Sequence, residues 1–434
     1  MKRMLMVALV AFVVGSSVRA QKAPAVRQVG ALERVSADSI SLKSVSIALA
    51  MPGGRVMLDD NVGRRVLVLD STLSRATVAA DTTAGTANAY GMSWATLIRY
   101  RGDSALLIAP SMLSMLVLSP TGATARVMAI PRPDDAQSFG SSFGPVVLDA
   151  RGRLLYFRGV LPGVMTLTLG MQLLQDGKPT EITQRLRQFS GGTPFDIGKV
   201  TVDSGTLLRV DLESRTVDTA AYIRVPKYLR DIRVDADGKL QSIVTTPDAL
   251  PVVDQWTMLH DGTLAIVRGR DYHVDWIDPS GKRTTSPKIP FDWQRVNDAR
   301  KTQLIDSAAA VWQKVFDDNA GGRRGGGANI GRGAKSDVAP NIAGKAALSE
   351  LPDYDPPFRE HALTTDRDDN IWVQTTQLVD GRPVYDVINR RGVLIDRVQL
   401  PPFRTIAGFG PGVVYMAVID RAGVVHLERA RIRS

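Results

Sequence analysis

The chain has 434 residues, of which 44% are hydrophobic and 23% charged, so it is long enough for one large globular domain or two to three small ones. Lys and Arg number 54 against 44 Asp and Glu, which gives a formal net charge of +10. The absence of cysteine excludes disulfides, thiolate metal sites, iron–sulfur clusters and cysteine nucleophiles, and four scattered histidines exclude a histidine-rich metal cage.

The first twenty residues predict an export signal. Lys2 and Arg3 precede an uninterrupted apolar run over residues 4–14, and small residues lead up to Ala20. This order is typical of a secretory signal peptide cleaved after Ala20. The alternative is an uncleaved membrane anchor, but the apolar run would cross only about half of a bilayer core. We therefore expect a secreted or periplasmic protein with no transmembrane segment after cleavage.

A hairpin pattern recurs along the rest of the chain. In each copy a short apolar strand leads into a polar turn, often with Asp, Asn or Gly, and a second strand follows. The copies lie at 66–78, 115–127, 207–219, 273–285, 385–397 and 415–427. A second hairpin signal precedes most of them, so each unit predicts a four-stranded antiparallel sheet.

Four-stranded sheets that recur every forty-odd residues predict a β-propeller, an all-β fold in which the sheets are arranged radially as blades. Six turns predict six blades, near 44–80, 88–131, 143–225, 231–290, 357–400 and 403–431. Residues 231–290 carry two hairpin signals, so seven blades is an alternative, and a large β-sandwich is another. The last blade lacks a strand, which we expect residues 28–35 to supply.

One segment carries a family resemblance. TDRDDNIWVQTT (365–376) resembles the D-x-x-G-N-I-W-V strand signature of NHL-type and TolB-like six-bladed propellers, and VDADGKL and LDARGRL are weaker copies. Asp369 stands where the signature usually has glycine. The resemblance implies a propeller turn followed by a packed strand, and it implies little about activity.

Two insertions interrupt the pattern. Residues 293–319 place Ile305, Ala309 and Trp312 at helical spacing and predict an amphipathic helix lying on the propeller, its apolar stripe packed within the chain. The Gly-rich stretch 320–347 lacks large apolar residues, so we expect a flexible loop. The insertion at 160–204 is not assigned. The predicted organisation is: 1–20 signal peptide, 21–43 N-terminal segment with the ring-closing strand, 44–292 four blades, 293–350 helical and Gly-rich insertion, 351–434 two blades.

Several motifs that suggest chemistry lack the context that the chemistry needs. Ser142 sits in a literal G-x-S-x-G, but a hairpin follows it instead of the helix of a nucleophile elbow. Asp366, Asp368 and Asn370 have the opening spacing of a calcium loop, yet Ile371 occupies the required glycine position. No cofactor is predicted, although a propeller axis leaves room for a divalent cation held by several blades.

Two polar clusters are the candidate ligand-binding residues. The first is Arg268, Arg270, Asp271, His273 and Asp275, where alternation places Tyr272, Val274 and Trp276 on the packed face of a strand. The second is Arg359, Glu360 and His361. Both precede or connect strands, and loops that converge at the mouth of a propeller often carry its site. The alternative is that these are ordinary solvated turn residues.

The sequence favours a non-catalytic binding or scaffold protein that recognises a protein, peptide or glycan of the cell envelope through the loops of one propeller face. One alternative is a metal-dependent hydrolase or lactonase with an axial cation, and another is an oligomerising envelope component in which the helix at 296–316 docks a partner. Arginines are spread over the blades instead of forming one stripe, so no nucleic-acid partner is predicted. The positive charge is interpreted as aiding solubility or weak contact with anionic polymers of the envelope.

Overall fold

The computed structural model describes residues 23–86, 88–91, 94–140, 144–149, 151–159, 199–234, 240–322 and 341–433. The predicted signal peptide, Ser142, most of the 160–204 insertion and the Gly-rich residues 323–340 lie outside the described residues. Within the described ranges, no helix combines the length and apolar character needed to cross a bilayer.

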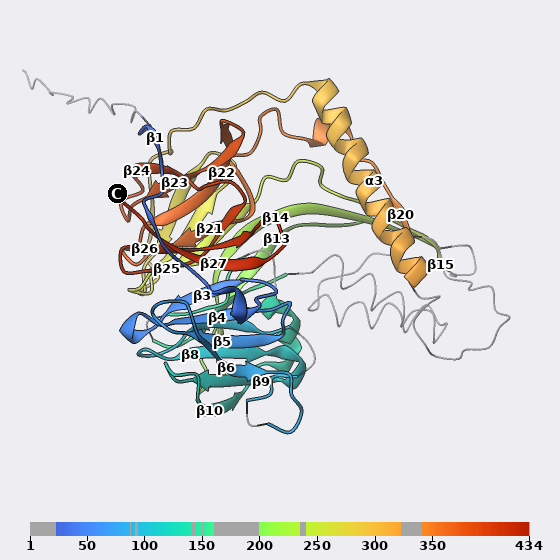
Figure 1. The fold of residues 1–434 in the computed structure, drawn as a ribbon. Helices are drawn as coiled ribbons and strands as arrows, with labels where there is room; N and C mark the ends of the chain where they lie inside the picture. The colour runs from blue at the N-terminus through green and yellow to red at the C-terminus, as the bar shows by residue number, and fades with distance from the viewer. Residues whose placement is uncertain are drawn as a thin grey trace, which may run out of the picture.

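The strands of the described residues form six sheets (Figure 1). The first contains β3 (Ile47–Ala50), β4 (Val56–Asp60), β5 (Arg65–Leu69) and β6 (Ala76–Asp81), and the second contains β7 (Thr96–Arg99), β8 (Ala105–Ala109), β9 (Ser114–Leu118) and β10 (Thr124–Ala129). The fourth contains β16 (Asp254–Met258), β17 (Leu264–Arg268), β18 (His273–Ile277) and β19 (Arg283–Thr285). In all three, consecutive strands pair antiparallel.

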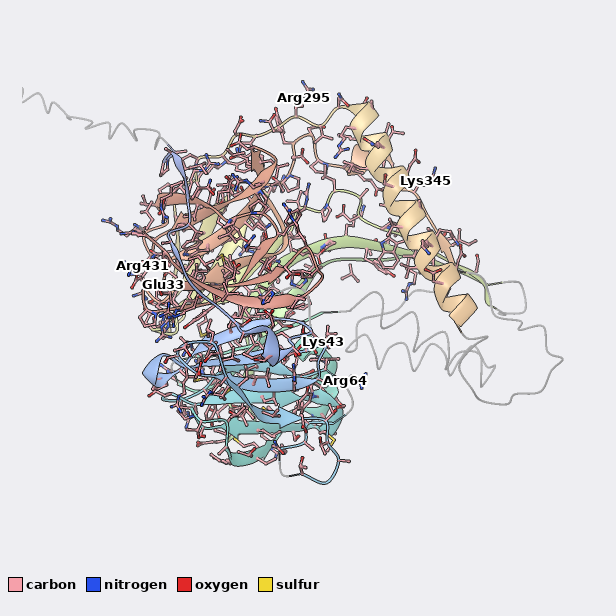
Figure 2. All side chains as sticks on the ribbon, in the orientation of Figure 1. Glu33, Lys43, Arg64, Arg295, Lys345 and Arg431 are labelled. Atoms are coloured by element: carbon pink, nitrogen blue, oxygen red, sulfur yellow. The ribbon has the colours of Figure 1, made fainter. Side chains whose placement is uncertain are left out.

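The last two sheets each gain a strand from the N-terminal segment. The fifth contains β21 (Phe358–Thr365), β22 (Ile371–Val379), β23 (Arg382–Ile388) and β24 (Leu394–Gln399), with β1 (Val26–Gln28) added parallel to β24. The sixth contains β25 (Arg404–Gly410), β26 (Val413–Ile419) and β27 (Val425–Arg431), with β2 (Leu32–Val35) antiparallel to β27. Glu33 and Arg431 lie side by side at this edge (Figure 2), with 2.9 Å between Glu33 Oε1 and Arg431 Nε.

The third sheet has six strands and extends beyond the others. It contains β11 (Val147–Leu148), β12 (Leu154–Arg158), β13 (Lys199–Val210), β14 (Val217–Val234), β15 (Leu240–Thr246) and β20 (Asn341–Ala343). The first hairpin signal of 231–290 therefore belongs to β14 and β15, and only the second lies in the fourth sheet. Residues 199–204, 226–234 and β15 form an arm that projects toward α3 (Asp298–Gly322) in Figure 1.

Six hydrophobic clusters join the sheets into a closed ring. Each of five clusters lies between one sheet and the next along the chain, and a sixth joins the last sheet to the first through Tyr415, Leu427 and Leu58. Strand β12 illustrates the packing: Leu154 and Tyr156 face the second sheet, while Leu155 and Phe157 face the fourth. This radial packing confirms the β-propeller prediction, and two facing sheets of a sandwich would not close on themselves.

The first strand of each sheet lies innermost, since neighbouring first strands contact one another around most of the ring. Because successive strands are antiparallel, the turns that join first to second strands lie at one end of the ring. We call this end the turn face. The loops that join second to third strands lie at the other end, which we call the loop face.

The helix packs on the arm, which corrects the expectation that it lies on the blades. The Trp312 ring lies 6.0 Å from the Tyr228 ring of β14, and Ile305 packs with Leu250 and Leu351. Asn297 caps the helix by accepting a hydrogen bond from the Arg300 N–H at 2.9 Å. The apolar stripe is therefore buried within the chain.

The end of the predicted flexible loop is also ordered. Residues 341–343 form β20, which pairs parallel with β15, and Gly344 N–H donates to Thr245 O at 2.7 Å. Ala343 N–H donates to Gln313 Oε1 of the helix at 3.0 Å. Composition missed this strand because three residues beside a sheet edge need no apolar run of their own. Short 3-10 segments complete the secondary structure: η1 (Asp38–Ile40), η2 (Pro52–Gly54), η3 (Pro110–Met112), η4 (Pro133–Gly140) and η5 (Leu348–Glu350).

The conformation and contacts of Asp369 explain why an aspartate can stand where the family signature has glycine. Its φ of 60° is the left-handed conformation that glycine adopts without cost. Its carboxylate accepts the His260 backbone N–H at 2.8 Å and lies 2.6 Å from His260 Nδ1, which ties the turn of the fifth sheet to that of the fourth. The backbone strain of an aspartate in this conformation is thus offset by an inter-sheet contact.

Asp59 provides a test of how the first sheet is packed. Burial, with a smaller effect of the Asp60 charge, raises its pKa to about 7, and its side chain is not hydrogen-bonded within the described residues. The unfolded chain releases this proton near pH 4, whereas the folded chain retains it until about pH 7. Stability should therefore fall as pH rises between these values.

Asp59→Asn should remove that pH dependence, because the amide stays neutral. We expect the variant to exceed the wild type in unfolding free energy by about 2–4 kcal/mol at pH 8 and to match it near pH 4. Urea unfolding at both pH values measures this, with exposed Asp38→Asn as the control. An Asp59→Asn variant that retains the wild-type pH dependence would contradict this account of burial.

Candidate binding cleft

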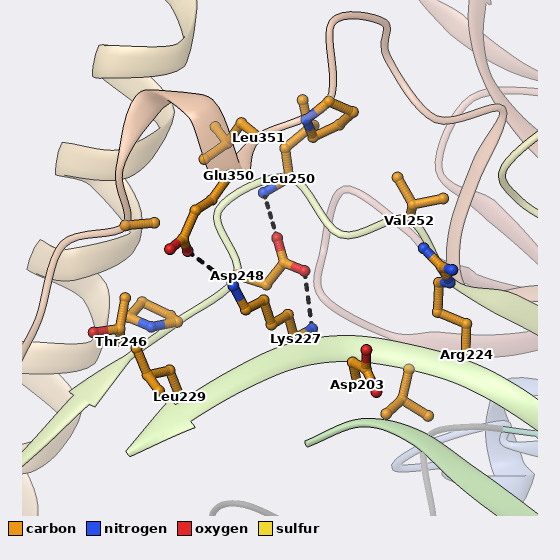
Figure 3. A pocket seen from close by; sticks show the side chains of 14 residues that line it. Asp203, Arg224, Lys227, Leu229, Thr246, Asp248, Leu250, Val252, Glu350 and Leu351 are labelled. Carbon is orange, nitrogen blue, oxygen red and sulfur yellow. Dashed lines mark hydrogen bonds and ion pairs between the residues drawn. The ribbon is translucent and has the colours of Figure 1, made fainter. Parts of the chain in front are cut away.

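A cleft opens on the loop face where the arm joins the ring. Its larger part has a volume of about 750 Å³ and is lined by Arg224, Val252, Gly269, Arg270, Asp271, Lys288, Trp293, Glu350, Leu351, Pro352, Asp353, Tyr354 and Pro356. A smaller adjoining part of about 150 Å³ shares Arg224 and Glu350 and continues along the arm (Figure 3). We refer to both parts together as the cleft.

Three segments distant in sequence build its walls: the loop between β17 and β18, the segment 346–356 after β20, and the segment 246–252 that follows the arm. Tyr272 anchors the first of these, since its ring is fully buried and its hydroxyl donates to Asp386 Oδ2 at 2.9 Å. Gly269 is required next to it, because a Cβ there would lie 2.1 Å from Val253 O. The cleft wall is therefore fixed to the core.

Arg268 and Asp275, two of the predicted ligand residues, are engaged in an ion-pair network. Arg268 Nη1 lies 2.7 Å from Asp254 Oδ2, and its Nε lies 2.8 Å from Asp275 Oδ2. Partial burial acts to lower the pKa of Arg268, but the two carboxylates outweigh it and raise that pKa. This geometry gives both residues a structural role beneath the cleft.

Arg270 and Asp271 do line the cleft. Arg270 is exposed, whereas the Asp271 carboxylate contacts His273 and Lys288. Its Oδ1 lies 2.9 Å from His273 Nδ1 and its Oδ2 lies 3.6 Å from Lys288 Nζ. His273 is mostly buried and positions Asp271 without lining the cleft itself. The packed face of β18 is as the alternation predicted, with Val274 and Trp276 in the core.

The second predicted cluster lies at the start of β21 and outside the cleft lining. Arg359 Nη2 pairs with Asp355 Oδ1 at 3.3 Å, and His361 is exposed with a φ of 58°. The Glu360 carboxyl is close enough to Asp248 to be affected by the charge of that carboxylate. Burial first, and then the Asp248 charge, raises the pKa of the Glu360 carboxyl.

Asp248 belongs to the smaller part of the cleft. Its carboxylate accepts the backbone N–H of Lys227 at 2.9 Å and of Leu250 at 3.2 Å (Figure 3). Burial nevertheless raises the pKa of Asp248, because desolvation outweighs these two hydrogen bonds. Above it, Lys227 Nζ pairs with Glu350 Oε2 at 3.1 Å and joins the arm to the segment 346–356.

Most of the cleft lining could not be predicted from the sequence. Arg224 comes from β14, Lys288 and Trp293 follow β19, and Tyr354 follows the helix insertion. None belongs to a recognisable motif, and they meet only because the arm folds back beside the fourth sheet. A basic residue next to isolated aromatics was the available signal, and it is too common to be informative.

In the larger part of the cleft the unpaired charges are cationic, whereas Asp203 and Asp248 of the smaller part have no ion-pair partner within the described residues. Asp271 pairs with Lys288, Glu350 with Lys227, and Asp353 Oδ1 with Lys301 Nζ at 2.7 Å. Arg224 and Arg270 have no carboxylate partner within the described residues. The cleft therefore presents two free guanidinium groups beside Trp293 and the half-exposed Tyr354, a lining suited to an anionic group with an apolar neighbour.

The metal-ligand motifs do not converge in the described ranges. No group of three His, Asp or Glu side chains suited to hold a metal ion occurs there. The Asp366 carboxylate accepts the N–H groups of Asp368 and Asn370, each at 2.9 Å, and the Trp372 indole N–H at 2.9 Å. The calcium-like spacing is thus a turn that caps the β21–β22 hairpin.

Of the comparisons with known proteins, only the one with solved structures finds similar proteins, and these are propellers. No protein-family model matches the chain, and no curated protein matches it. Structures similar to it include a streptogramin B lyase, at 12% identity over 91% of this chain and 95% of that one with a TM-score of 0.36. A Xanthomonas campestris gluconolactonase is 10% identical over 95% of this chain and 98% of that one, with a TM-score of 0.35. An Agrobacterium tumefaciens regucalcin described as calcium-binding is 11% identical over 94% of this chain and 98% of that one, with a TM-score of 0.37. At these identities and TM-scores they carry no argument about activity.

Asp254→Ala should destabilise the protein strongly. Besides Arg268, the Asp254 carboxylate accepts the backbone N–H of Arg224 at 2.9 Å, so the change leaves an unpaired amide and a partly buried guanidinium that keeps only Asp275 as its ion-pair partner. We expect a loss of about 3–5 kcal/mol in unfolding free energy. Asp271→Ala, at a side chain that is 39% exposed, should cost less than about 1 kcal/mol.

Urea denaturation of the two variants measures this difference. Equal losses would show that Asp254 does not anchor the cleft wall.

Proposed function

We propose that this protein is an exported binding protein whose cleft recognises a carboxylate-bearing segment of a protein or peptide in the cell envelope. The observation that carries the proposal is the pair of uncommitted guanidinium groups, Arg224 and Arg270, on the walls of the cleft. Every acidic side chain of the larger part already has a cationic partner in the same chain. Within the larger part, a ligand carboxylate would thus meet two donors and no unpaired acid.

The size and the remaining lining favour a short peptide segment. A volume of about 750 Å³ lies within the range of small-ligand and peptide sites. Trp293, Tyr354 and Leu351 offer apolar surface next to the arginines, which suits an acidic residue flanked by an apolar one. A glycan that carries uronic acids presents carboxylates without apolar side chains, so it uses only half of this lining.

Arg224→Gln and Arg270→Gln should each weaken ligand binding about tenfold, because each removes a charge-assisted hydrogen bond worth roughly 1.5–3 kcal/mol. The probe is a set of acidic–apolar peptides measured by fluorescence anisotropy, with matched Asn/Gln peptides and oligogalacturonate as separate arms. Arg391→Gln, an exposed arginine on the turn face, is the control and should bind normally.

Binding of oligogalacturonate in place of the peptides would replace the peptide proposal by a glycan one. Equal affinity for acidic and amide peptides, or an equal loss in the Arg391→Gln control, would contradict the role of the cleft arginines.

We also propose that the chain is a six-bladed propeller of the TolB-like and NHL-type group, with each sheet as one blade. The turn and strand at 365–376 support this.

Export is proposed from residues 1–20, and the N-terminus of the mature protein would begin at Gln21. The metal-dependent hydrolase alternative is tested by elemental analysis of protein purified without chelator: one equivalent of a divalent ion would support it.

A further inference from the structure

The two parts of the cleft carry unpaired charges of opposite sign. The larger part presents the two guanidinium groups described above. The smaller part is lined by the carboxylates of Asp203 and Asp248, and neither has an ion-pair partner within the described residues. The third acid of the smaller part, Glu350, is already paired with Lys227 at 3.1 Å. One continuous cleft therefore has a cationic and an anionic end.

An irregularity in the arm places Asp203 in the smaller part. The ladder between β13 and β14 skips from the pair Val202–Tyr228 to the pair Ser204–Arg224, which leaves Asp203 opposite three residues of β14. The middle one of the three is Pro226, which has no N–H to donate to a ladder. Because such a bulge turns a side chain out of the regular alternation, Asp203 is exposed in the cleft lining.

The same irregularity orients Asp248. The Lys227 N–H, which has no ladder partner on β13, donates to Asp248 Oδ2 at 2.9 Å, and the Leu250 N–H donates to Oδ1 at 3.2 Å (Figure 3). These two hydrogen bonds fix the carboxylate on the wall of the smaller part. Since a carboxylate oxygen can accept two hydrogen bonds, each oxygen keeps one acceptor position open within the described residues.

The surroundings of Asp248 leave its charge poorly compensated. Burial is the main reason that the pKa of Asp248 is raised; the Lys227 charge acts against the increase, and the Glu350 charge adds to it. The Glu360 carboxyl is also close enough to be affected by Asp248. A partly desolvated carboxylate beside other acids gains from a cation that a ligand supplies.

The size and apolar lining of the smaller part suit the end of one long side chain. Its volume of about 150 Å³ is well below the roughly 300–1,000 Å³ of a site for a whole small molecule. Leu229, Leu250 and Val252 line it beside the two carboxylates (Figure 3). A lysine side chain has this composition, because its apolar stem ends in an ammonium group with three donors.

We propose that the smaller part of the cleft binds an ammonium group of the same peptide segment whose carboxylate binds Arg224 and Arg270, so that the ligand is an acidic and basic segment. This inference rests on the proposed function and adds the second recognition element. The ammonium would donate to the open acceptor positions of Asp203 and Asp248. The two ends of the cleft would then fix the direction in which the segment lies.

Four matched peptides separate the two ends of the cleft. They carry glutamate and lysine, glutamate alone, lysine alone, or glutamine at both positions, and lysine is placed at one to four residues from glutamate in a series. All are N-acetylated, and binding to the full mature chain is measured by fluorescence anisotropy. We expect lysine at its best position to tighten binding about tenfold. A peptide with a free N-terminal amine in place of lysine tests the other source of an ammonium group.

Asp203→Asn and Asp248→Asn should each reduce the gain from lysine to less than about threefold and leave the affinity of the glutamate-only peptide within about twofold. Asp380→Asn is the control, because Asp380 is an exposed carboxylate on another loop of the loop face and outside the cleft lining. Asp203 is exposed, so its variant remains informative even if Asp248→Asn alters the wall of the smaller part.

The absence of any gain from lysine or from the free amine would overturn the proposal. So would a gain that persists in both aspartate variants, or an equal gain from acetyl-lysine, which keeps the apolar stem without the charge. Binding that depends on glutamate but not on lysine would retain the proposed function and reject the ammonium site. Binding that depends on lysine and Asp248 but not on glutamate would do the reverse, and no binding of any peptide would contradict both.

Discussion

Each central strand of this protein must bury both of its faces, and the rest of the structure depends on that constraint. Leu154–Arg158 shows it most clearly, because alternate side chains of one strand enter two different hydrophobic clusters. A sheet of this kind is stable only with a neighbour on each side, and a ring is the arrangement that gives every sheet two neighbours. The cluster of Leu58, Tyr415 and Leu427 joins the end of the chain to its beginning, while β2 completes the last sheet.

The same packing explains the many arginines. Their spread along the sequence suggested a solubilising charge, but several are fixed partners of carboxylates that are at most 8% exposed. These pairs are Arg65–Asp60, Arg132–Asp135, Arg153–Asp149, Arg268–Asp254, Arg397–Asp386 and Arg404–Glu428. A buried carboxylate needs a charged partner with several donors, which the guanidinium supplies. Arg224 and Arg270 of the cleft have no such partner within the described residues.

The regular part of the fold could be predicted from sequence because turn residues and strand periodicity are local. The hairpins, the packed face of β18 and the amphipathic helix follow from residues a few positions apart. The arm could not be predicted, because Lys199–Val210 and Val217–Val234 are longer than a blade strand and pair through register, which no local pattern reveals. For the same reason only part of the first candidate cluster lines the cleft: Arg270 and Asp271 do, whereas Arg268 and Asp275 lie beneath it. The second cluster, Arg359, Glu360 and His361, lies outside the lining.

The arm gives this propeller its cleft, because it carries Lys227 to Glu350 in the segment that follows the helix, and Arg224 precedes the arm on β14. The most direct measurement is hydrogen–deuterium exchange of the mature protein with and without the tightest-binding acidic peptide. We expect slower exchange in residues 224–229, 246–254, 268–272 and 348–356, with the turns at 100–104 and 259–263 unchanged. Protection confined to those turns, or spread evenly over the ring, would contradict the assignment of the cleft as the binding site.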